Sequence, residues 1–363
     1  MSATIQAEPA TVWHASSEGY APRRFAACPR SASSPGRLIA PRPPTTIAAM
    51  VSRDRRSVGL WLPAALACVP LALSQPLCAE PARGNLVVIG GGSRPASIMG
   101  LFACLAKGPQ GKVLVFPQAS ERPEAGQEIE QELKALGIGR VVVMPLDRAG
   151  ADSAQALRLA EGATGAYLGG GDQARLMAVL RDTRLEQALL RLYRDGAVIA
   201  GTSAGAAVMS RVMITGDEKR PLSKDESWQT IEAENVLTGQ GLGLLDDAVI
   251  DQHFVRRRRQ NRLVSLLLEN PALLGIGIDE ATAAWVKPDR TFEVVGDGPV
   301  LVLDASEART RRDEPGYGLR GSGLRLHVLR AGAQYDLARR ALVRLLPTDS
   351  PEPAPAQTPC APR

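Results

Sequence analysis

The feature that most constrains the fold of this chain is a regular alternation of apolar and amphipathic segments between residues 85 and 200. The apolar segments are short and partly β-branched, as is typical of buried strands, and they cover residues 86–89, 113–116, 141–144, 166–168 and 197–200. Between them lie segments with the pattern of helices, at about 96–107, 124–136, 152–161, 173–180 and 184–194. Strands that are apolar throughout and alternate with helices indicate a parallel sheet. We therefore predict an α/β fold with a doubly wound, mostly parallel sheet and helices on both faces.

Further strands are expected at 247–251, 275–280 and 283–286, and the segments 291–296 and 299–304 have the pattern of a β-meander that finishes the same sheet. Residues 85–346 are expected to form a single α/β domain, with 311–346 as a peripheral β/α end. The proline-rich tail 347–363 is expected to be disordered. In doubly wound sheets, ligands bind outside the carboxyl ends of the strands. Residues directly after these strands are therefore the first candidates for a functional site.

The stretch 201–205, Gly-Thr-Ser-Ala-Gly, follows the fifth strand and precedes a segment that can begin a helix. A serine flanked by glycines at a strand-to-helix turn is typical of a nucleophile elbow, because glycine lets the backbone turn sharply without a Cβ clash. The alternative is a glycine-rich turn that holds an incidental serine. The pattern makes Ser203 the candidate nucleophile.

A serine hydroxyl is a weak nucleophile unless a base takes its proton, and the chain has three histidines. His14 lies in the N-terminal segment and His327 in a late strand, where packing is the expected role. His253, directly after the strand 247–251, is therefore the candidate base, with a purely structural histidine as the alternative. Such a base needs an orienting carboxylate, and Asp279 and Glu280 compete for that role. Because they are adjacent, only one of them can point into the site.

An oxyanion formed at Ser203 is expected to lie between the backbone N–H of Ala204 and an N–H of the turn 169–172, which we assign to Gly171. The glycines 169–171 also suit a phosphate cradle, but the GxGxxG and P-loop patterns are missing. Beyond residue 79 the cysteines are too few for a metal cluster. We expect neither a cofactor nor a metal.

Arginines occupy positions 256–259 and 262, and we expect them to open the helix that follows His253. Runs of charge usually face solvent. Guanidinium groups so close to the candidate base can nevertheless clamp a carboxylate bidentately. The sequence therefore predicts a substrate that carries negative charge beside the scissile bond.

The net charge of +5 is located in the first 79 residues, which hold eight arginines and three acidic residues. The rest of the chain has 35 basic and 35 acidic residues. This balance removes the basic excess that nucleic-acid binding needs. A nucleic-acid partner is not expected.

Residues 50–79 have the pattern of a signal peptide: a basic segment at 53–56, an apolar run at 58–73, and candidate cleavage sites after Ser74 and Ala79. A membrane anchor is the alternative, but Pro63 and Pro70 interrupt the run, which is short for a span. We expect export to the periplasm or out of the cell from a start near Met50, without a stable membrane span after cleavage. Residues 1–49 are then a disordered extension or a mis-assigned start.

Four ordered motifs resemble the cyanophycinase family: residues 170–173, 201–209, 251–254 and 275–280. These enzymes are serine peptidases related to peptidase E, with a class I glutamine-amidotransferase-like fold. The likeness covers residues 85 to about 300, and the four motifs together are far more specific than any one of them.

The resemblance implies an exopeptidase that hydrolyses cyanophycin, a poly-aspartate whose β-carboxyls carry arginine, to β-Asp-Arg dipeptides, and it implies a homodimer. It also implies that Ser203 is the nucleophile, His253 the base and Glu280 the third member of the triad. The positions that match substrate-binding residues of the family are Gln173, Asp251, Gln252, Arg257, Arg259 and Arg262. Asp172, directly before Gln173, is a further expected substrate-binding residue. Arg256 and Arg258 are additional basic residues, so which arginines contact the substrate is left open. The export signal departs from the intracellular enzymes and resembles secreted relatives.

Two other functions remain open at this point. The first is a peptidase-E-like dipeptidase that acts on Asp-X peptides with the same triad. The second is an exported binding protein on a decayed hydrolase scaffold, against which the intact Ser203, His253 and Glu280 argue.

Overall fold

A nine-stranded mixed sheet is the centre of the computed structural model, which describes residues 82–221 and 228–345. The strand order is β17-β16-β11-β10-β1-β5-β4-β2-β3. The parallel strands are β1 (Asn85–Ile89), β5 (Val198–Thr202), β4 (Gly165–Leu168), β2 (Lys112–Phe116) and β3 (Arg140–Val143). The antiparallel strands are β10 (Thr282–Val286), β11 (Thr291–Gly296), β16 (Gln334–Asp336) and β17 (Ala341–Arg344). The expectation of a mostly parallel sheet is therefore wrong for the half beyond β1.

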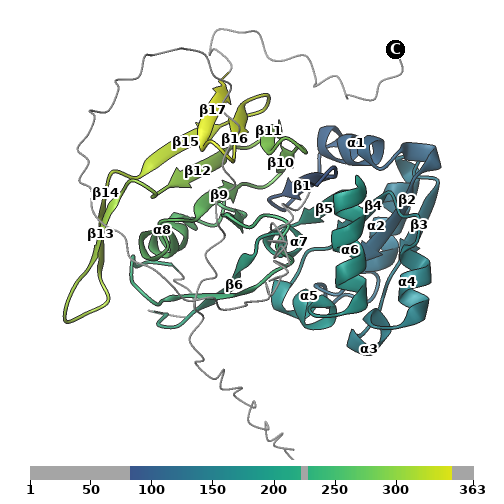
Figure 1. The fold of residues 1–363 in the computed structure, drawn as a ribbon, viewed down its shortest axis with the longest axis horizontal. Helices are drawn as coiled ribbons and strands as arrows, with labels where there is room; N and C mark the ends of the chain where they lie inside the picture. Colours follow the sequence, from purple (N-terminus) through teal and green to yellow (C-terminus); the bar gives the residue numbers. More distant parts are fainter. Residues whose placement is uncertain (1–81, 222–227, 346–363) are drawn as a thin grey trace, which may run out of the picture. The chain divides into compact units, whose positions relative to one another are not determined.

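Helices cover both faces of the parallel half (Figure 1), as the alternation of segments predicts. They are α1 (Ala96–Leu105), α2 (Ala125–Ala135), α3 (Arg148–Ala151), α4 (Ala154–Ala160), α5 (Gln173–Leu180) and α6 (Arg184–Asp195), with a 3-10 turn at Gly108–Gln110. Successive residues of a strand point to opposite faces. Val87 and Ile89 of β1 accordingly pack with α1 and α2, whereas Leu86 and Val88 share a core with α4, α5 and α6.

A second sheet carries two of the strands that precede candidate site residues. Its order is β15-β12-β9-β8, with β8 (Ala248–Gln252) parallel to β9 (Leu274–Ile278), and β12 (Val300–Asp304) and β15 (Arg325–Leu329) antiparallel. One face joins the main core through Ile250 and Ile276, and the other packs against α8 (Gln260–Glu269) through Val249.

The expected single sheet is therefore divided into two. The chain leaves the second sheet after β9 through Ala281, whose φ is 55°, and enters β10 of the main sheet. It returns after β11 through Gly296, whose φ is 107°. These left-handed residues turn the backbone too sharply for β11 and β12 to continue as one meander.

Two hairpins lie outside the sequence-based expectations, whereas β15 matches the late strand that was expected to hold His327. The hairpins are β6 (Val212–Glu218) with β7 (Val236–Gln240), and β13 (Arg309–Arg312) with β14 (Leu319–Ser322). Within the described part of 311–346 the elements are strands without a helix, which corrects the expected β/α end. Beyond β14, its strands lie at the edges of the two large sheets, where β15 pairs with β12, and β17 and β16 end the main sheet.

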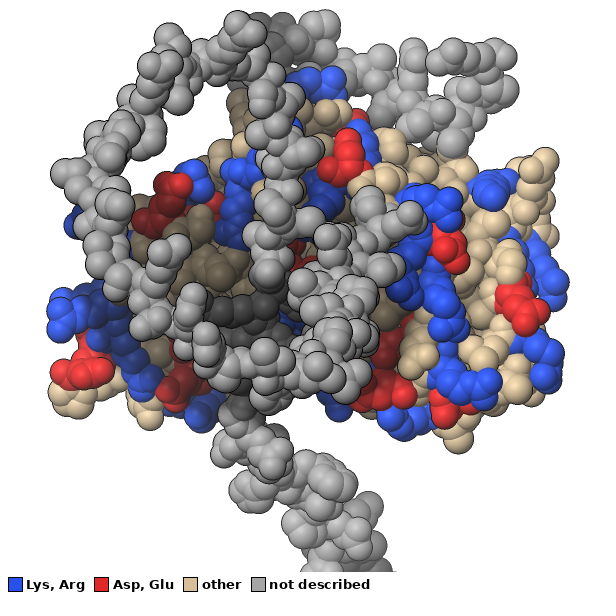
Figure 2. Space-filling model, in the orientation of Figure 1, with Lys and Arg blue, Asp and Glu red and all other residues tan. Residues whose placement is uncertain are grey.

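The expected signal peptide at 50–79, the extension 1–49 and the tail 347–363 lie outside the described residues. Across 82–221 and 228–345, no helix is long and apolar enough to cross a membrane. Where the described surface is visible in Figure 2, basic and acidic side chains are interspersed. That mixture agrees with the balanced charge of the chain beyond residue 79.

Asp304, at the end of β12, connects the second sheet to the main one. It is 1% exposed and accepts hydrogen bonds from Arg325 Nη2 at 2.7 Å and from Arg340 Nη1, just before β17, at 2.8 Å. Burial by itself raises the pKa of this carboxyl, but the Ser306 N–H and the two arginines outweigh it, so the pKa lies below its usual range.

We predict that Asp304→Asn lowers the free energy of unfolding at pH 7 by about 2 kcal/mol, because charge-assisted hydrogen bonds are lost. A carboxyl whose folded pKa is depressed stabilises the protein above its unfolded pKa. The difference between wild type and variant should therefore shrink as the pH falls below about 4. Urea unfolding at several pH values measures it. Glu307→Gln, which removes an exposed partner of Arg325, should change stability by less than about 1 kcal/mol.

Candidate active site

Three side chains from separate parts of the fold form one hydrogen-bonded chain. Ser203 Oγ lies 2.9 Å from His253 Nε2, and His253 Nδ1 lies 2.6 Å from Glu280 Oε1. Ser203 follows β5 of the main sheet, and His253 follows β8 of the second sheet. Glu280 lies in the connection from β9 to β10. The predicted triad residues are therefore brought together, although they do not lie at the edge of one sheet as expected.

Ser203 has an unusual backbone conformation, with φ 53° and ψ −113°, between β5 and the short helix α7 (Ala204–Ala207). Such a conformation costs about 1–3 kcal/mol and persists only where its surroundings enforce it. A Cβ on Gly201 would lie 2.3 Å from the carbonyl oxygen of Gly205, and one on Gly205 would lie 2.1 Å from that of Leu168. Both flanking glycines are thus required by close backbone packing. This packing explains why the pattern at 201–205 has glycine on each side of the serine.

The end of β1 binds the backbone next to all three side chains. The carbonyl oxygen of Ile89 accepts from the Ser203 N–H at 3.0 Å, and that of Gly90 accepts from the His253 N–H at 2.8 Å. The carbonyl oxygen of Gly91 accepts from the N–H of Ala281, next to Glu280, at 2.9 Å. Three consecutive carbonyls therefore set the relative positions of the three residues.

Gly91 and Gly92 are functional positions that the sequence-based reasoning missed. A Cβ on Gly91 would lie 2.3 Å from Cε1 of the His253 ring, and one on Gly92 would lie 2.8 Å from the Cβ of Glu280. The two glycines leave the room that the base and its carboxylate occupy. The signal was present, because a glycine triplet directly follows the first strand just as another follows the fourth.

The structure separates the two carboxylates that competed to orient the base. Glu280 contacts His253, whereas Asp279 turns away and accepts from the backbone N–H of Arg256 at 2.9 Å. The choice of Glu280, which the resemblance implied, therefore agrees with the geometry.

The His253 side chain is buried, and its residue is 6% exposed. Burial is the main cause that lowers the pKa of this imidazole below its usual value, and the nearby guanidiniums of Arg257 and Arg259 lower it further. The carboxylate of Glu280 opposes this shift only in part. The imidazole is therefore neutral at pH 7, as a base that accepts a proton from Ser203 must be.

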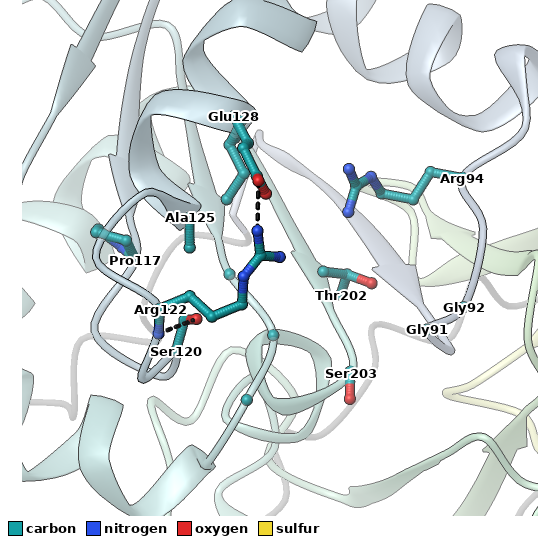
Figure 3. A pocket seen from close by; sticks show the side chains of 14 residues that line it. Gly91, Gly92, Arg94, Pro117, Ser120, Arg122, Ala125, Glu128, Thr202 and Ser203 are labelled. Atoms are coloured by element: carbon teal, nitrogen blue, oxygen red, sulfur yellow. Dashed lines mark hydrogen bonds and ion pairs between the residues drawn. The ribbon is translucent and has the colours of Figure 1, made fainter.

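Ser203 lies between two hollows in the protein surface. The first, which we call the α2 hollow, has a volume of about 280 Å³ and is shown in Figure 3. Its lining residues with charged or hydroxyl side chains are Arg94, Ser120, Arg122, Glu128, Thr202 and Ser203. The Arg122 side chain points from the loop before α2 toward Glu128.

The second hollow, which we call the β6 hollow, has a volume of about 260 Å³. It is lined by the expected residues Asp172, Gln173, Gln252, Arg257 and Arg259, together with Thr215, Gly216 and Asp217 of β6. Asp172 caps α5 by accepting from the Ala174 N–H, and Gln173 donates to the carbonyl of Ile214 at 2.9 Å. The structure therefore brings five of the seven expected substrate-binding residues into the lining of one hollow.

Asp251 and Arg262 do not line either hollow, which corrects the expectation that they contact substrate. Asp251 is 0% and Arg262 1% exposed, and the two form a bidentate ion pair. The Arg262 guanidinium also lies 4.8 Å from the Trp228 ring centroid. This buried pair lies next to a residue that does line the hollow, because Asp251 Oδ1 is 4.0 Å from Arg259 Nη1.

The arginine run does not open the following helix, since α8 begins at Gln260 and residues 254–259 are turns. Within the run, Arg257 and Arg259 line the β6 hollow, and Arg256 and Arg258 are absent from its lining. Arg258, between the two lining arginines, has a left-handed backbone conformation with φ 53°, and the direction of the chain changes there.

The two expected oxyanion donors lie near Ser203: Ala204 follows it directly, and Gly171 lines both hollows together with it. Among the described residues, neither backbone N–H has a hydrogen-bond acceptor, whereas the N–H of Asp172 is bound to the Ala119 carbonyl. Gly171 has φ 135° and packs so tightly on that carbonyl that a Cβ would lie 2.0 Å from it. Gly171 and Ser203 are the two residues that line both hollows.

Across the described residues, no group of three or more histidine, cysteine, aspartate or glutamate side chains is arranged to hold a metal ion.

Comparison with known proteins gives consistent matches. The model of peptidase family S51 matches residues 86–294. The cyanophycinase of Trichormus variabilis is 34% identical over 268 residues, covering 71% of this chain and 87% of that protein. The cyanophycinase of Synechococcus elongatus is 35% identical over 270 residues, covering 70% and 80%. The crystal structure of a peptidase from an acI-B1 Actinobacterium shares the fold, with a TM-score of 0.51 at 23% identity over 70% of this chain and 98% of that one.

We predict that Gly91→Ala slows the labelling of Ser203 by a fluorophosphonate by about 10²–10⁴-fold, because the new Cβ displaces the His253 ring and removes the general base. Labelling is followed by mass spectrometry, and circular dichroism checks the fold. Gly100→Ala is the matched control, since a Cβ at that position in α1 meets nothing within 4 Å. Equal labelling rates for the two variants would contradict the assigned packing.

We also predict that Arg257→Gln moves the acidic limb of the labelling rate to higher pH. The lowered pKa of His253 keeps the base neutral to below pH 6.5, and removal of a nearby cation raises that pKa. Rates measured between pH 4 and 8 give the midpoint. Arg256→Gln removes the same charge outside the hollow and should shift the midpoint less. An unchanged midpoint in Arg257→Gln would show that this cation does not act on His253.

Proposed function

Because this chain belongs to peptidase family S51 and is a serine peptidase, we propose that it hydrolyses cyanophycin to β-Asp-Arg dipeptides. The observation that carries the proposal is the hydrogen-bonded chain of Ser203, His253 and Glu280 next to a hollow lined by arginine and acidic side chains. The cyanophycinases reported above share about a third of their sequence with this chain over most of their length. These matches confirm the resemblance that four sequence motifs indicated.

In the proposed reaction, the Ser203 turn acts as a nucleophile elbow. Ser203 Oγ attacks the carbonyl carbon of a backbone amide while its proton passes to His253 Nε2. The oxyanion is held by the N–H groups of Ala204 and Gly171, and one such donor contributes about 3 kcal/mol. The C–N bond then breaks, and the leaving amine takes the proton from His253. A water molecule hydrolyses the resulting ester, giving its proton to His253, and Ser203 recovers its hydroxyl proton as the acid leaves.

The remaining groups of the site have matching roles in this proposal. Glu280 holds the Nδ1–H of His253 and stabilises the imidazolium that forms. Arg257 and Arg259 face the β6 hollow and suit the free carboxylate of the arginine in the polymer, while Asp172 suits its guanidinium. Arg259 is largely buried, and this burial lowers its pKa to about 10, which leaves it charged at pH 7.

We predict that the purified protein clears insoluble cyanophycin and releases β-Asp-Arg, and that Ser203→Ala lowers the rate on the order of 10⁶-fold. His253→Asn should be similarly inactive. His327→Asn is the matched control, because His327 lies on β15 against the Tyr335 ring, away from Ser203. Cleavage of Asp-X dipeptides without clearing would favour a peptidase-E-like dipeptidase. Binding without turnover would favour a non-catalytic binding protein.

We further propose that the protein is exported and that residues 50–79 are removed, on the pattern of those residues alone. Intact-mass and N-terminal analysis of the protein from the cell envelope and medium should give a chain that begins at Gln75 or Glu80. A cytoplasmic chain that retains residues 50–79 would contradict export. The homodimer that the resemblance implied also stays a prediction.

A further inference from the structure

The position of Ser203 between two separate hollows has a consequence for how a polymer is held. The α2 and β6 hollows share Gly171 and Ser203, the predicted oxyanion donor and the nucleophile. A carbonyl bound for attack therefore lies at their junction. The substrate on one side of the scissile amide then occupies one hollow, and the substrate on the other side occupies the second.

The sizes of the hollows limit what each one holds. With volumes of about 280 and 260 Å³, both fall just below the range of ~300–1,000 Å³ typical of pockets for whole drug-sized ligands. Neither hollow has room for several repeat units. The geometry suits one small unit on each side of Ser203.

The α2 hollow presents one exposed cation and one exposed anion. Arg122 is paired with Glu128 and, at 2.8 Å, with Glu124, and the side chains of Arg122 and Glu128 are 59% and 53% exposed. Exposed pairs of this kind are weak, because water screens them and ordering two long side chains costs entropy. Both groups can therefore exchange each other for charges on a ligand.

Arg94 in the same hollow is held in place more firmly than Arg122. Its guanidinium makes two hydrogen bonds to Glu132 of α2, and both side chains are less than a third exposed. This bidentate pair is geometrically fixed. Arg94 is therefore a rigid wall of the hollow, and the adaptable charges are those of Arg122 and Glu128 (Figure 3).

We propose that the α2 hollow is a second substrate subsite, in which Arg122 binds the carboxylate and Glu128 the guanidinium of one β-aspartyl-arginine unit. The β6 hollow binds the adjoining unit, with Arg257 and Arg259 for its carboxylate and Asp172 and Asp217 for its guanidinium. The arginine of each unit carries one carboxylate and one guanidinium, and each hollow supplies a complement to both. This inference rests on the proposed function and identifies the minimal substrate as two joined units.

The test uses the two-unit peptide (β-Asp-Arg)₂ and two analogues in which citrulline, a neutral isostere, replaces the arginine of one unit or the other. We expect Glu128→Gln to lower kcat/KM for the parent peptide about 10–100-fold, as expected for loss of a charged contact. The kcat/KM of this variant should then be the same for the parent peptide and for the analogue with citrulline in the unit that the α2 hollow binds. Citrulline in the other unit should lower it as much as it does for the wild type. Asp217→Asn should show the opposite pattern, because its carboxylate lies in the β6 hollow. A structural role for either residue would not produce this crossover.

Two further variants complete the experiment. Arg122→Gln should lower kcat/KM for the parent peptide about as much as Glu128→Gln does. This loss should vanish when the arginine carboxylate of the unit in the α2 hollow is replaced by a carboxamide. Glu121→Gln is the matched control, because Glu121 pairs with Arg175 and does not line the α2 hollow. It should retain wild-type kcat/KM.

The outcomes separate the two proposals. Wild-type protein that cleaves neither the polymer nor the two-unit peptide overturns the proposed function and this inference with it. Cleavage by the wild type, with Glu128→Gln and Arg122→Gln within twofold of it, overturns the second subsite alone. The second subsite is also overturned if Glu128→Gln and Asp217→Asn both lose their sensitivity to citrulline in the same unit. The two hollows would then not bind different units.

Discussion

Three consecutive carbonyl oxygens at the end of β1 are the constraint on which the site depends. Those of Ile89, Gly90 and Gly91 bind the N–H groups of Ser203, His253 and Ala281. All three donors have positive φ values, 53°, 49° and 55°. Such conformations cost about 1–3 kcal/mol each, so they exist only because the surrounding packing compensates. Ile89 ends the central buried strand β1, and Gly90 and Gly91 continue directly from it. This short segment therefore holds three strained residues in one arrangement.

The division into two sheets follows from the same junction. Ser203 belongs to the main sheet and His253 to the second one, and Glu280 lies on the connection between them. The distances between the three side chains thus depend on how the sheets dock. The buried Asp304, which binds Arg325 of the second sheet and Arg340 just before β17 of the main sheet, is one of the contacts that fix this docking.

Sequence reasoning predicted the parallel half of the fold well, because strands 86–89 to 197–200 and the helices between them have strong periodicity. It also identified Ser203 and His253, since each directly follows a strand. The pattern left Asp279 and Glu280 as alternatives after the next strand, and the family resemblance chose Glu280. It placed 299–304 in the wrong sheet, because the Gly-Asp-Gly-Pro sequence at 296–299 signals a turn but does not tell which sheet the next strand joins. That choice depends on tertiary packing, such as that of Gly296 against the carbonyl of Ala281. Arg122 and Glu128 were missed for a similar reason: no motif surrounds them, and only the folded chain brings them near Ser203.

The arginine-rich segment shows how burial divides identical side chains among different roles. Arg257 is exposed and lines the β6 hollow, whereas Arg262 is fully buried. A buried guanidinium without a counter-charge is very costly, and Asp251 supplies that charge through two hydrogen bonds. Arg259 lies between these extremes, 4.0 Å from Asp251 and bonded to the carbonyl of Gln252 at 2.7 Å. Asp251 therefore neutralises Arg262 and also allows Arg259 to stay charged at the wall of the hollow. A carboxylate without substrate contact can in this way be as necessary to an anion-binding wall as the arginines that form it.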